Sequence, residues 1–307
     1  MTSLEQQEEE VSVTEESDVF AVDKHDSANS SAVKLAYSSV FSRVQAAVAL
    51  RPLMRPCRMV AVSKTKPAAS ILEIYNEGHR HFGENYVQEL VSKSLDPSLQ
   101  IGVGRVKERN LIQSEEYITG ASTNKGEETP IRWHFIGQLQ SNKSKLLVSS
   151  VPALYMVESV DSIKLATLLD KAVSSVDEGG STTRIFPGPL LVLVQINTSG
   201  EPQKGGCEIG TNESIALSRH ILQSCPKLKL AGFMTIGRLG EVDGKCFERL
   251  VNERKIVSEA LGLQEHELEL SMGMSGDFEL AIEHGATSVR VGSSIFGARE
   301  SKLNQKV

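Results

Sequence analysis

The chain has 307 residues, enough for one large domain or two small ones, and its 40% hydrophobic and 23% charged residues are typical of a globular protein. The net charge of -6 arises at the N-terminus, because residues 1–30 hold nine acids against one base. Residues 31–307 are nearly neutral, with 30 acids and 32 bases, so nothing in the charge favours a nucleic acid as partner.

Cysteine usage and the N-terminal sequence bear on the compartment. The four cysteines are scattered and form no C-x-x-C pair, so we expect reduced thiols and neither a disulfide framework nor a zinc site. The N-terminus has no basic flank followed by an apolar run, and it is acid-rich without arginine, which argues against a secretory signal or a transit peptide. No window approaches ~18 continuous apolar residues, so no membrane span is expected. These features predict a soluble, cytoplasmic protein.

The first predicted segments are a tail and a helix. Residues 1–30 are acidic and rich in Ser and Thr, and they hold too few large apolar residues to offset the entropy of ordering, so a disordered tail is expected. From Ser31 to Leu50, apolar residues recur at helical spacing and predict a helix that packs on the domain. The folded domain is expected to span 31–307.

Short apolar runs then alternate with amphipathic stretches. Strands are predicted at Met59–Val62, Arg80–Gly83, Trp133–Ile136, Leu154–Val157, Leu190–Ile196, Leu228–Met234, Glu267–Ser271 and Ser288–Val291. Helices are predicted at Ala68–Gly78, Tyr86–Lys93, Lys143–Ser149, Ile163–Ser174, Asn212–Ser224, Lys245–Leu261 and Asp277–Gly285.

Eight strands, each followed by a helix, predict a single (β/α)8 barrel of about 250 residues. An open, doubly wound sheet of seven strands is the alternative, but no G-x-G-x-x-G follows the first strand. The polar, glycine-containing region from about 95 to 130 interrupts the alternation, and we interpret it as a surface insertion.

Lys64 follows the first predicted strand directly. Functional residues of such barrels lie where strands end. A lysine desolvated at the mouth of a barrel is more often neutral, and its amine can form an imine with an aldehyde. The alternative is a surface lysine ahead of Pro67, which begins the next helix.

Small polar residues follow the last two predicted strands, where barrels frequently bind phosphate through hydroxyl and backbone N–H groups. Ser275, Gly292 and Ser293 suit that role, although the serines could equally be helix N-caps. Arg290 is a charge in a predicted core strand and needs a partner there. With Lys64 opposite, this pattern favours a phosphorylated carbonyl compound as ligand.

Three further positions are candidates. Asn85, after the second strand, could orient the ring of a ligand. His134, in the third, is either a general base or an ordinary core histidine. Lys204 is a loop lysine at the same expected face, and its alternative is a solvated charge. No cluster of residues suggests a metal.

Five blocks of this sequence resemble the pyridoxal phosphate homeostasis protein family. They read VSKTKP (62–67), FGENYVQE (82–89), WHFIGQLQSNK (133–143), LSMGMSGD (270–277) and VRVGSSIFGAR (289–299). In this order they cover about residues 35–299 outside the insertion, and neither the acidic tail nor the insertion belongs to the compact bacterial pattern.

The resemblance implies a barrel like the N-terminal domain of bacterial alanine racemase, with pyridoxal 5'-phosphate (PLP) held as a Schiff base on Lys64. It implies that Ser275, Gly292 and Ser293 bind the phosphate and that Arg290 lies near the pyridine nitrogen. Asn85, Met272 and Gly273 would line the ring, and Lys204 would be a second attachment or transfer site.

Three functions follow from these expectations. The first is a non-catalytic carrier of PLP in vitamin B6 homeostasis, a monomer that releases the aldehyde to apo-enzymes. The second is a PLP-dependent amino-acid racemase, which would need a further β-rich domain, whereas this chain ends eight residues after Arg299. The third is a Schiff-base aldolase, which would need an acid/base group besides Lys64.

Overall fold

The computed structural model describes residues 23–51, 56–102, 129–179, 184–240 and 242–298. Most of the expected tail (residues 1–22 of 1–30) and most of the expected insertion (103–128 of about 95–130) therefore lie outside the described residues. In the described part, no helix is both long enough and apolar enough to cross a membrane.

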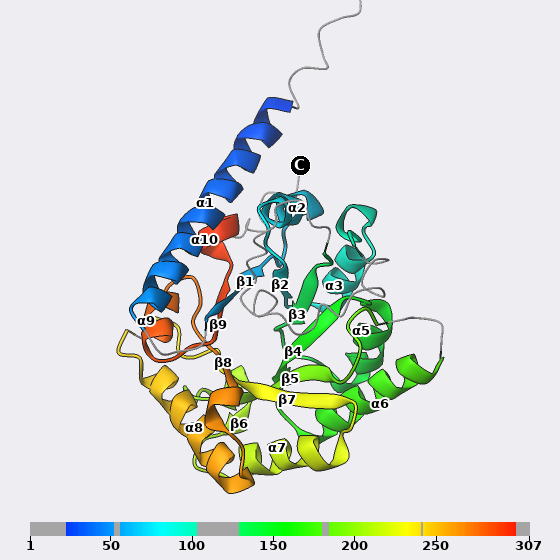
Figure 1. Cartoon of the computed structure of the whole chain (residues 1–307), viewed down its shortest axis with the longest axis vertical. Coiled ribbons are helices and arrows are strands. Elements are labelled where there is room, and N and C mark those ends of the chain that lie inside the picture. Colours follow the sequence, from blue (N-terminus) through cyan, green and yellow to red (C-terminus); the bar gives the residue numbers. More distant parts are fainter. Residues whose placement is uncertain (1–22, 52–55, 103–128, 180–183, 241, 299–307) are drawn as a thin grey trace, which may run out of the picture.

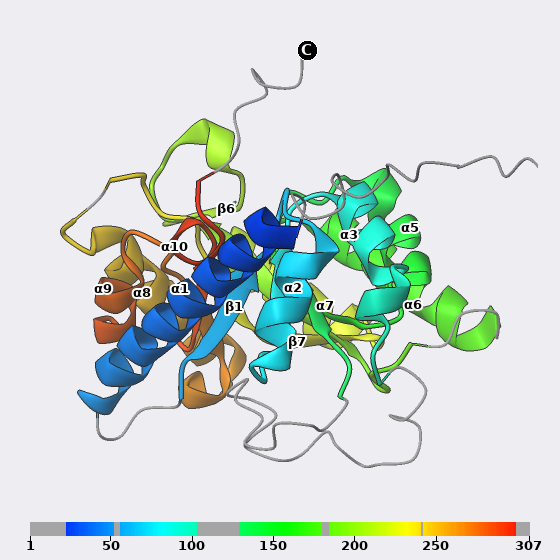
Figure 2. The same cartoon turned by 90° about the horizontal axis from the view of Figure 1, so that it is seen from above.

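Eight parallel strands close into a barrel, which confirms the predicted fold class. Their order is β4-β3-β2-β1-β9-β8-β7-β5, and pairing between β4 and β5 closes the ring. The strands are β1 (Arg58–Val62), β2 (His81–Glu84), β3 (Arg132–Phe135), β4 (Leu154–Val160), β5 (Leu190–Asn197), β7 (Leu228–Met234), β8 (Glu269–Ser271) and β9 (Ser288–Val291). A two-residue strand that sequence patterning did not predict, β6 (Cys207–Glu208), pairs with β5 outside the ring. In Figure 2 the yellow-green segment near β6 projects from one end of the barrel.

Helices surround the ring (Figure 1). They are α2 (Ala68–Asn76), α3 (Val87–Ser94), α5 (Ser144–Ser150), α6 (Ile163–Gly179), α7 (Glu213–Ser224), α8 (Lys245–Leu261), α9 (Phe278–Glu283) and α10 (Ser293–Phe296). Among the described residues, four 3-10 turns add to them: η1 (Pro97–Leu99), η3 (Ser141–Lys143), η4 (Pro202–Lys204) and η5 (Glu265–Glu267).

Helix α1 (Asp23–Ala49) lies along the outside of the barrel against α2, α9 and α10 (Figure 1). Buried residues at three- and four-residue spacing make this contact: Val33, Tyr37, Val40, Val44 and Ala47. The helix begins at Asp23, eight residues before the predicted start at Ser31. Composition missed this start because a helix anchored by packing extends into a polar segment at little cost.

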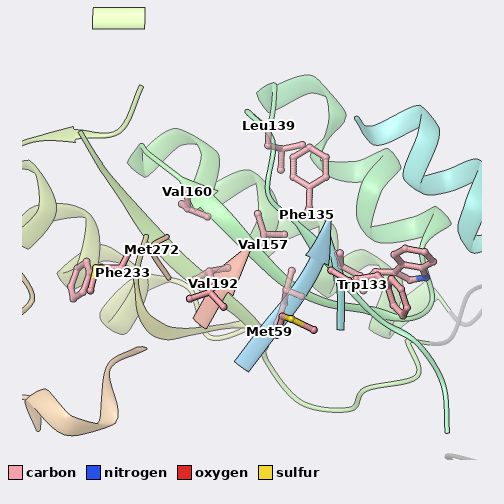
Figure 3. Packing of buried hydrophobic residues seen from close by; sticks show 14 of the residues in the cluster. Met59, Trp133, Phe135, Leu139, Val157, Val160, Val192, Phe233 and Met272 are labelled. Carbon is pink, nitrogen blue, oxygen red and sulfur yellow. The ribbon is translucent and has the colours of Figure 1, made fainter. Parts of the chain in front are cut away.

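Strand side chains alternate between two environments. One set faces the helices and forms the main core, which includes Met59, Trp133, Phe135, Val157 and Val192 (Figure 3). The other set points into the barrel. There, Met156, Leu193, Ala231 and Met234 form a small apolar cluster, and buried polar residues take many of the remaining positions.

Candidate functional site

The turn that carries Lys64 lies beside the turn that carries Gly292 and Ser293. Strands β1 and β9 pair in parallel with Ala61 opposite Val291, so both chains leave the barrel at the same end, side by side. The approach is close, because a Cβ added to Gly292 would lie 3.3 Å from Val62 Cβ. Lys64 itself is half-buried at this mouth.

Two backbone N–H groups converge next to this turn. Ser275 Oγ accepts hydrogen bonds from the N–H of Gly292 at 3.1 Å and from that of Ser294 at 3.3 Å. The Ser294 hydroxyl in turn donates to Ser275 O at 3.3 Å. Converging N–H donors and hydroxyls at the start of a short helix are the groups that a phosphate requires. Sequence reasoning missed Ser294, although it adjoins Ser293 in the same polar run.

Gly273 shapes the neighbouring loop after β8. Its φ is 91°, a left-handed conformation that favours glycine, and an added Cβ would lie 2.5 Å from Ala281 Cβ. Helix α9 therefore packs directly on the Gly273 backbone. The Met272 side chain is fully buried in the main hydrophobic core, so it is not exposed at the mouth of the barrel (Figure 3).

Asn85 lies on the other side of the Lys64 turn. Strand β2 pairs with β1 with Gly83 opposite Val62, which places Asn85 at the same end of the barrel. Asn85 Oδ1 is buried and has no hydrogen-bond partner among the described residues, so it is a polar atom suited to a ligand. The Asn85 backbone is fixed against Gly137, where an added Cβ would lie 2.0 Å from Asn85 O.

Arg290 points into the barrel from β9 and is held by neighbouring strands. Its Nη2 donates to Thr235 O at 2.7 Å and its Nη1 donates to Ser271 Oγ at 2.6 Å. Ser271 then donates to Glu158 Oε2 at 2.5 Å, and the Arg290 guanidinium lies 3.9 Å from the same oxygen. Burial opposes the ionisation of Glu158, but its hydrogen bonds and the nearby Arg290 charge hold the pKa of Glu158 below the ordinary value.

His134 belongs to the same buried chain of hydrogen bonds inside the barrel, because it contacts Glu158 as well. Its Nδ1 lies 2.7 Å from Glu158 Oε1, and its Nε2 lies 2.8 Å from His81 Nδ1. Arg132 Nη1 completes the chain at 2.9 Å from His81 Nε2. Because an arginine can only donate, both imidazoles must be neutral and pass their N–H toward Glu158. Burial lowers the pKa of both histidines, which agrees with this assignment.

Both ring nitrogens of His134 are therefore engaged inside the barrel. Sequence reasoning did not find its direct partners His81 and Glu158, nor Arg132 and Ser271, which bond to those partners. The available signal was a charged residue within an otherwise apolar strand, as in LYMVESV of β4.

Lys204 lies apart from this group. It ends η4, which follows β5, and β5 stands four places from β1 around the ring. Lys204 Nζ donates to Gly237 O at 2.5 Å and pairs with Glu201 at 2.7 Å. The predicted residues thus divide into a contiguous group at the ends of β2, β1, β9 and β8, one histidine inside the barrel on β3, and one lysine across the mouth.

The chain resembles known proteins over almost the whole barrel. Residues 45–300 match the model of the alanine racemase N-terminal domain. The mouse protein named pyridoxal phosphate homeostasis protein is 44% identical over 87% of each chain. A solved structure of an unknown protein from Bifidobacterium adolescentis has a TM-score of 0.67 at 30% identity, covering 88% of this chain and 96% of that one. PipY of Synechococcus elongatus, solved with PLP bound, has a TM-score of 0.59 at 27% identity, covering 86% of this chain and all of PipY.

The fold and the arrangement at the mouth thus define a barrel of the alanine racemase N-terminal class. Within that class, the chain belongs to the pyridoxal phosphate homeostasis protein family.

Proposed function

We propose that this chain binds PLP reversibly on Lys64 and acts as a carrier or buffer of PLP in vitamin B6 homeostasis. The observation that carries the proposal is that the half-buried Lys64 at the end of β1 adjoins a group of converging hydrogen-bond donors at the end of β9. The relatives' name and the PLP bound to PipY support the same ligand.

Each residue of the contiguous group has a role in this proposal. When bound, PLP supplies an aldehyde that condenses with a lysine amine and a phosphate that needs hydrogen-bond donors. Lys64 would hold the aldehyde carbon, and Ser275, Gly292 and Ser293, with Ser294, would hold the phosphate. Asn85 Oδ1, which has no partner among the described residues, and the backbone of Met272 and Gly273 would face the ring.

Arg290 would face the pyridine nitrogen. A guanidinium stays protonated, so Arg290 would donate to that nitrogen and leave it without a proton of its own. The ring is then a weaker electron sink, which suits a protein that holds the aldehyde without transforming amino acids.

A binding role is favoured over catalysis by the state of His134. A general base needs a free ring nitrogen toward the substrate, whereas both nitrogens of His134 are bonded within the barrel. An amino-acid racemase remains the second candidate, because the matching family model is a racemase domain. We propose further that the chain works in the cytoplasm as a monomer that delivers PLP to apo-enzymes, and that Lys204 is an auxiliary PLP site.

Reduction of the loaded protein tests the proposal. Borohydride should fix a pyridoxyl group on Lys64, found by peptide mass mapping, and Lys64→Ala should give colourless protein without this adduct. Lys66→Ala is the matched control, because Lys66 lies in the same turn and donates instead to Ala298 O. An adduct on another lysine would refute the assignment.

Turnover separates the carrier from the racemase. Loaded protein incubated with a panel of L-amino acids should leave their chirality unchanged, and sustained racemisation would overturn the carrier role. Light scattering of the purified chain at several concentrations tests the proposed monomer.

A further inference from the structure

The turn that carries Lys64 has a backbone conformation that its sequence disfavours. Lys66 N donates to Ser63 O at 3.0 Å, which closes a β-turn with Lys64 and Thr65 at its centre. Thr65 has a φ of 62°, and among the described residues it is the only non-glycine with positive φ. Type II turns place positive φ at this third position and favour glycine there, whereas threonine is β-branched.

Two side chains of α3 hold this turn. Glu89 Oε1 accepts a hydrogen bond from the Thr65 N–H at 2.5 Å. Lys93 Nζ lies one helical turn further and donates to Glu89 Oε1 at 2.7 Å, to Glu84 Oε1 at 2.7 Å and to Ser63 O at 2.8 Å. The three donors of the buried ammonium are thus all used.

These contacts fix the peptide groups on both sides of Lys64. Lys93 binds the carbonyl of the Ser63–Lys64 peptide, and Glu89 binds the N–H of the Lys64–Thr65 peptide. The orientation of that second peptide distinguishes a type II turn from a type I turn, in which no residue needs positive φ. The carboxylate of Glu89 therefore favours the strained form, and with it the direction in which the Lys64 side chain leaves the turn.

We propose that Glu89 and Lys93 are positioning residues that aim Lys64 at its ligand by holding Thr65 in the left-handed conformation. The proposal rests on the function proposed above, because it assigns the purpose of the strain to the reactive amine. Strained backbone that neighbouring groups hold in place is a recognised feature of functional sites.

A double-mutant cycle tests the role of Glu89. A left-handed conformation disfavours a non-glycine residue by about five- to thirtyfold, so Glu89→Ala should weaken PLP binding by a factor in that range. Glycine adopts positive φ freely, so in a Thr65→Gly background the same substitution should cost less than about threefold. Gln88→Ala, an exposed neighbour on α3, is the matched control. Affinity is read from the absorbance of bound PLP in a titration.

A second measurement does not depend on PLP. The rate at which acetic anhydride acetylates Lys64 in the unloaded protein, measured by mass spectrometry, should change with Glu89→Ala and be restored toward wild type in the double variant. If Glu89→Ala does not fold, Glu89→Gln replaces it: the amide keeps an acceptor for the Thr65 N–H but loses the charge that pairs with Lys93, and it too should weaken binding less in the Thr65→Gly background.

The outcomes separate the two proposals. If wild type forms no adduct on Lys64, the proposed function fails, and the acetylation rates alone then decide whether Glu89 orients the lysine. If wild type binds PLP and Glu89→Ala binds it equally well, or loses the same factor in both backgrounds, the positioning role is refuted.

Discussion

The substitution Glu158→Gln changes the carboxylate that accepts hydrogen bonds within the buried hydrogen-bond chain of the barrel interior. Glu158 is fully buried in β4, accepts hydrogen bonds from His134 at 2.7 Å and Ser271 at 2.5 Å, and lies 3.9 Å from Arg290. The amide keeps the size of the side chain but removes its charge and one acceptor oxygen. Arg290 then loses the carboxylate that balances its charge within the buried hydrogen-bond chain, and either His134 or Ser271 loses its hydrogen-bond acceptor.

The expected cost follows from that geometry. Removing one partner of a buried ion pair destabilises proteins by about 3–5 kcal/mol, because the remaining charge stays desolvated. For a protein of this size, that loss corresponds to a fall in Tm of about 6–20 °C. It is also a large share of a total stability of about 5–15 kcal/mol.

Urea unfolding followed by circular dichroism, at pH 7.5 and without PLP, measures the loss directly. Glu259→Gln is the control, because the Glu259 side chain is 68% exposed on α8, and its effect should stay within about 0.5 kcal/mol. A loss below about 1 kcal/mol for Glu158→Gln would refute the interpretation that this carboxylate is ionised and neutralises Arg290.

Three further predictions concern pH, packing and phosphate. Burial lowers the pKa of His81 and His134, and lowers that of His79 to about 3. Unfolded histidines titrate near pH ~6.5, so below that pH the unfolded chain binds more protons than the folded one. Urea unfolding should therefore show stability falling by up to about 1.4 kcal/mol per pH unit per histidine as the pH drops toward 3. A constant stability from pH ~6.5 to ~5 would contradict the assignment of neutral histidines. Gly273→Ala should cost about 1–3 kcal/mol of unfolding free energy, because its Cβ would lie 2.5 Å from Ala281 Cβ, and an unchanged Tm would refute that contact. Ser275→Ala should lower the affinity for PLP more than that for pyridoxal, which lacks the phosphate, and equal losses in parallel titrations would exclude Ser275 from the phosphate site.

Much of the fold could be predicted because barrel strands carry a strong apolar signal. Leu190–Val194 is a continuous apolar run, and β5 lies there with helices on its outer face. The two-residue strand β6 was missed because it is too short to show any periodicity. Helix α6 extends to Gly179, five residues beyond the predicted end. The prediction stopped too early because the last residues of the helix are mostly polar and exposed, and so lack the apolar spacing of the earlier turns.

The candidate site could be predicted only for residues that directly follow paired parallel strands, because the strand pairing then determines which residues lie side by side. Lys64, Gly292 and Ser293 follow strands that pair, so parallel register brings them together. The buried chain of hydrogen bonds that links Arg132 to Glu158 could not be found in this way, because its side chains come from different strands and meet inside the barrel. No sequence pattern indicated that Thr65 adopts positive φ, because the groups that contact this turn, Glu89 and Lys93, belong to a later helix.

A crystal structure of the chain soaked with PLP tests the central claim most directly. Our account predicts continuous electron density between Lys64 Nζ and the aldehyde carbon. It also predicts the phosphate within hydrogen-bond distance of the N–H groups of Gly292 and Ser294, where Ser275 Oγ now accepts both. PLP attached to a different lysine, or a phosphate bound away from the ends of β8 and β9, would contradict it.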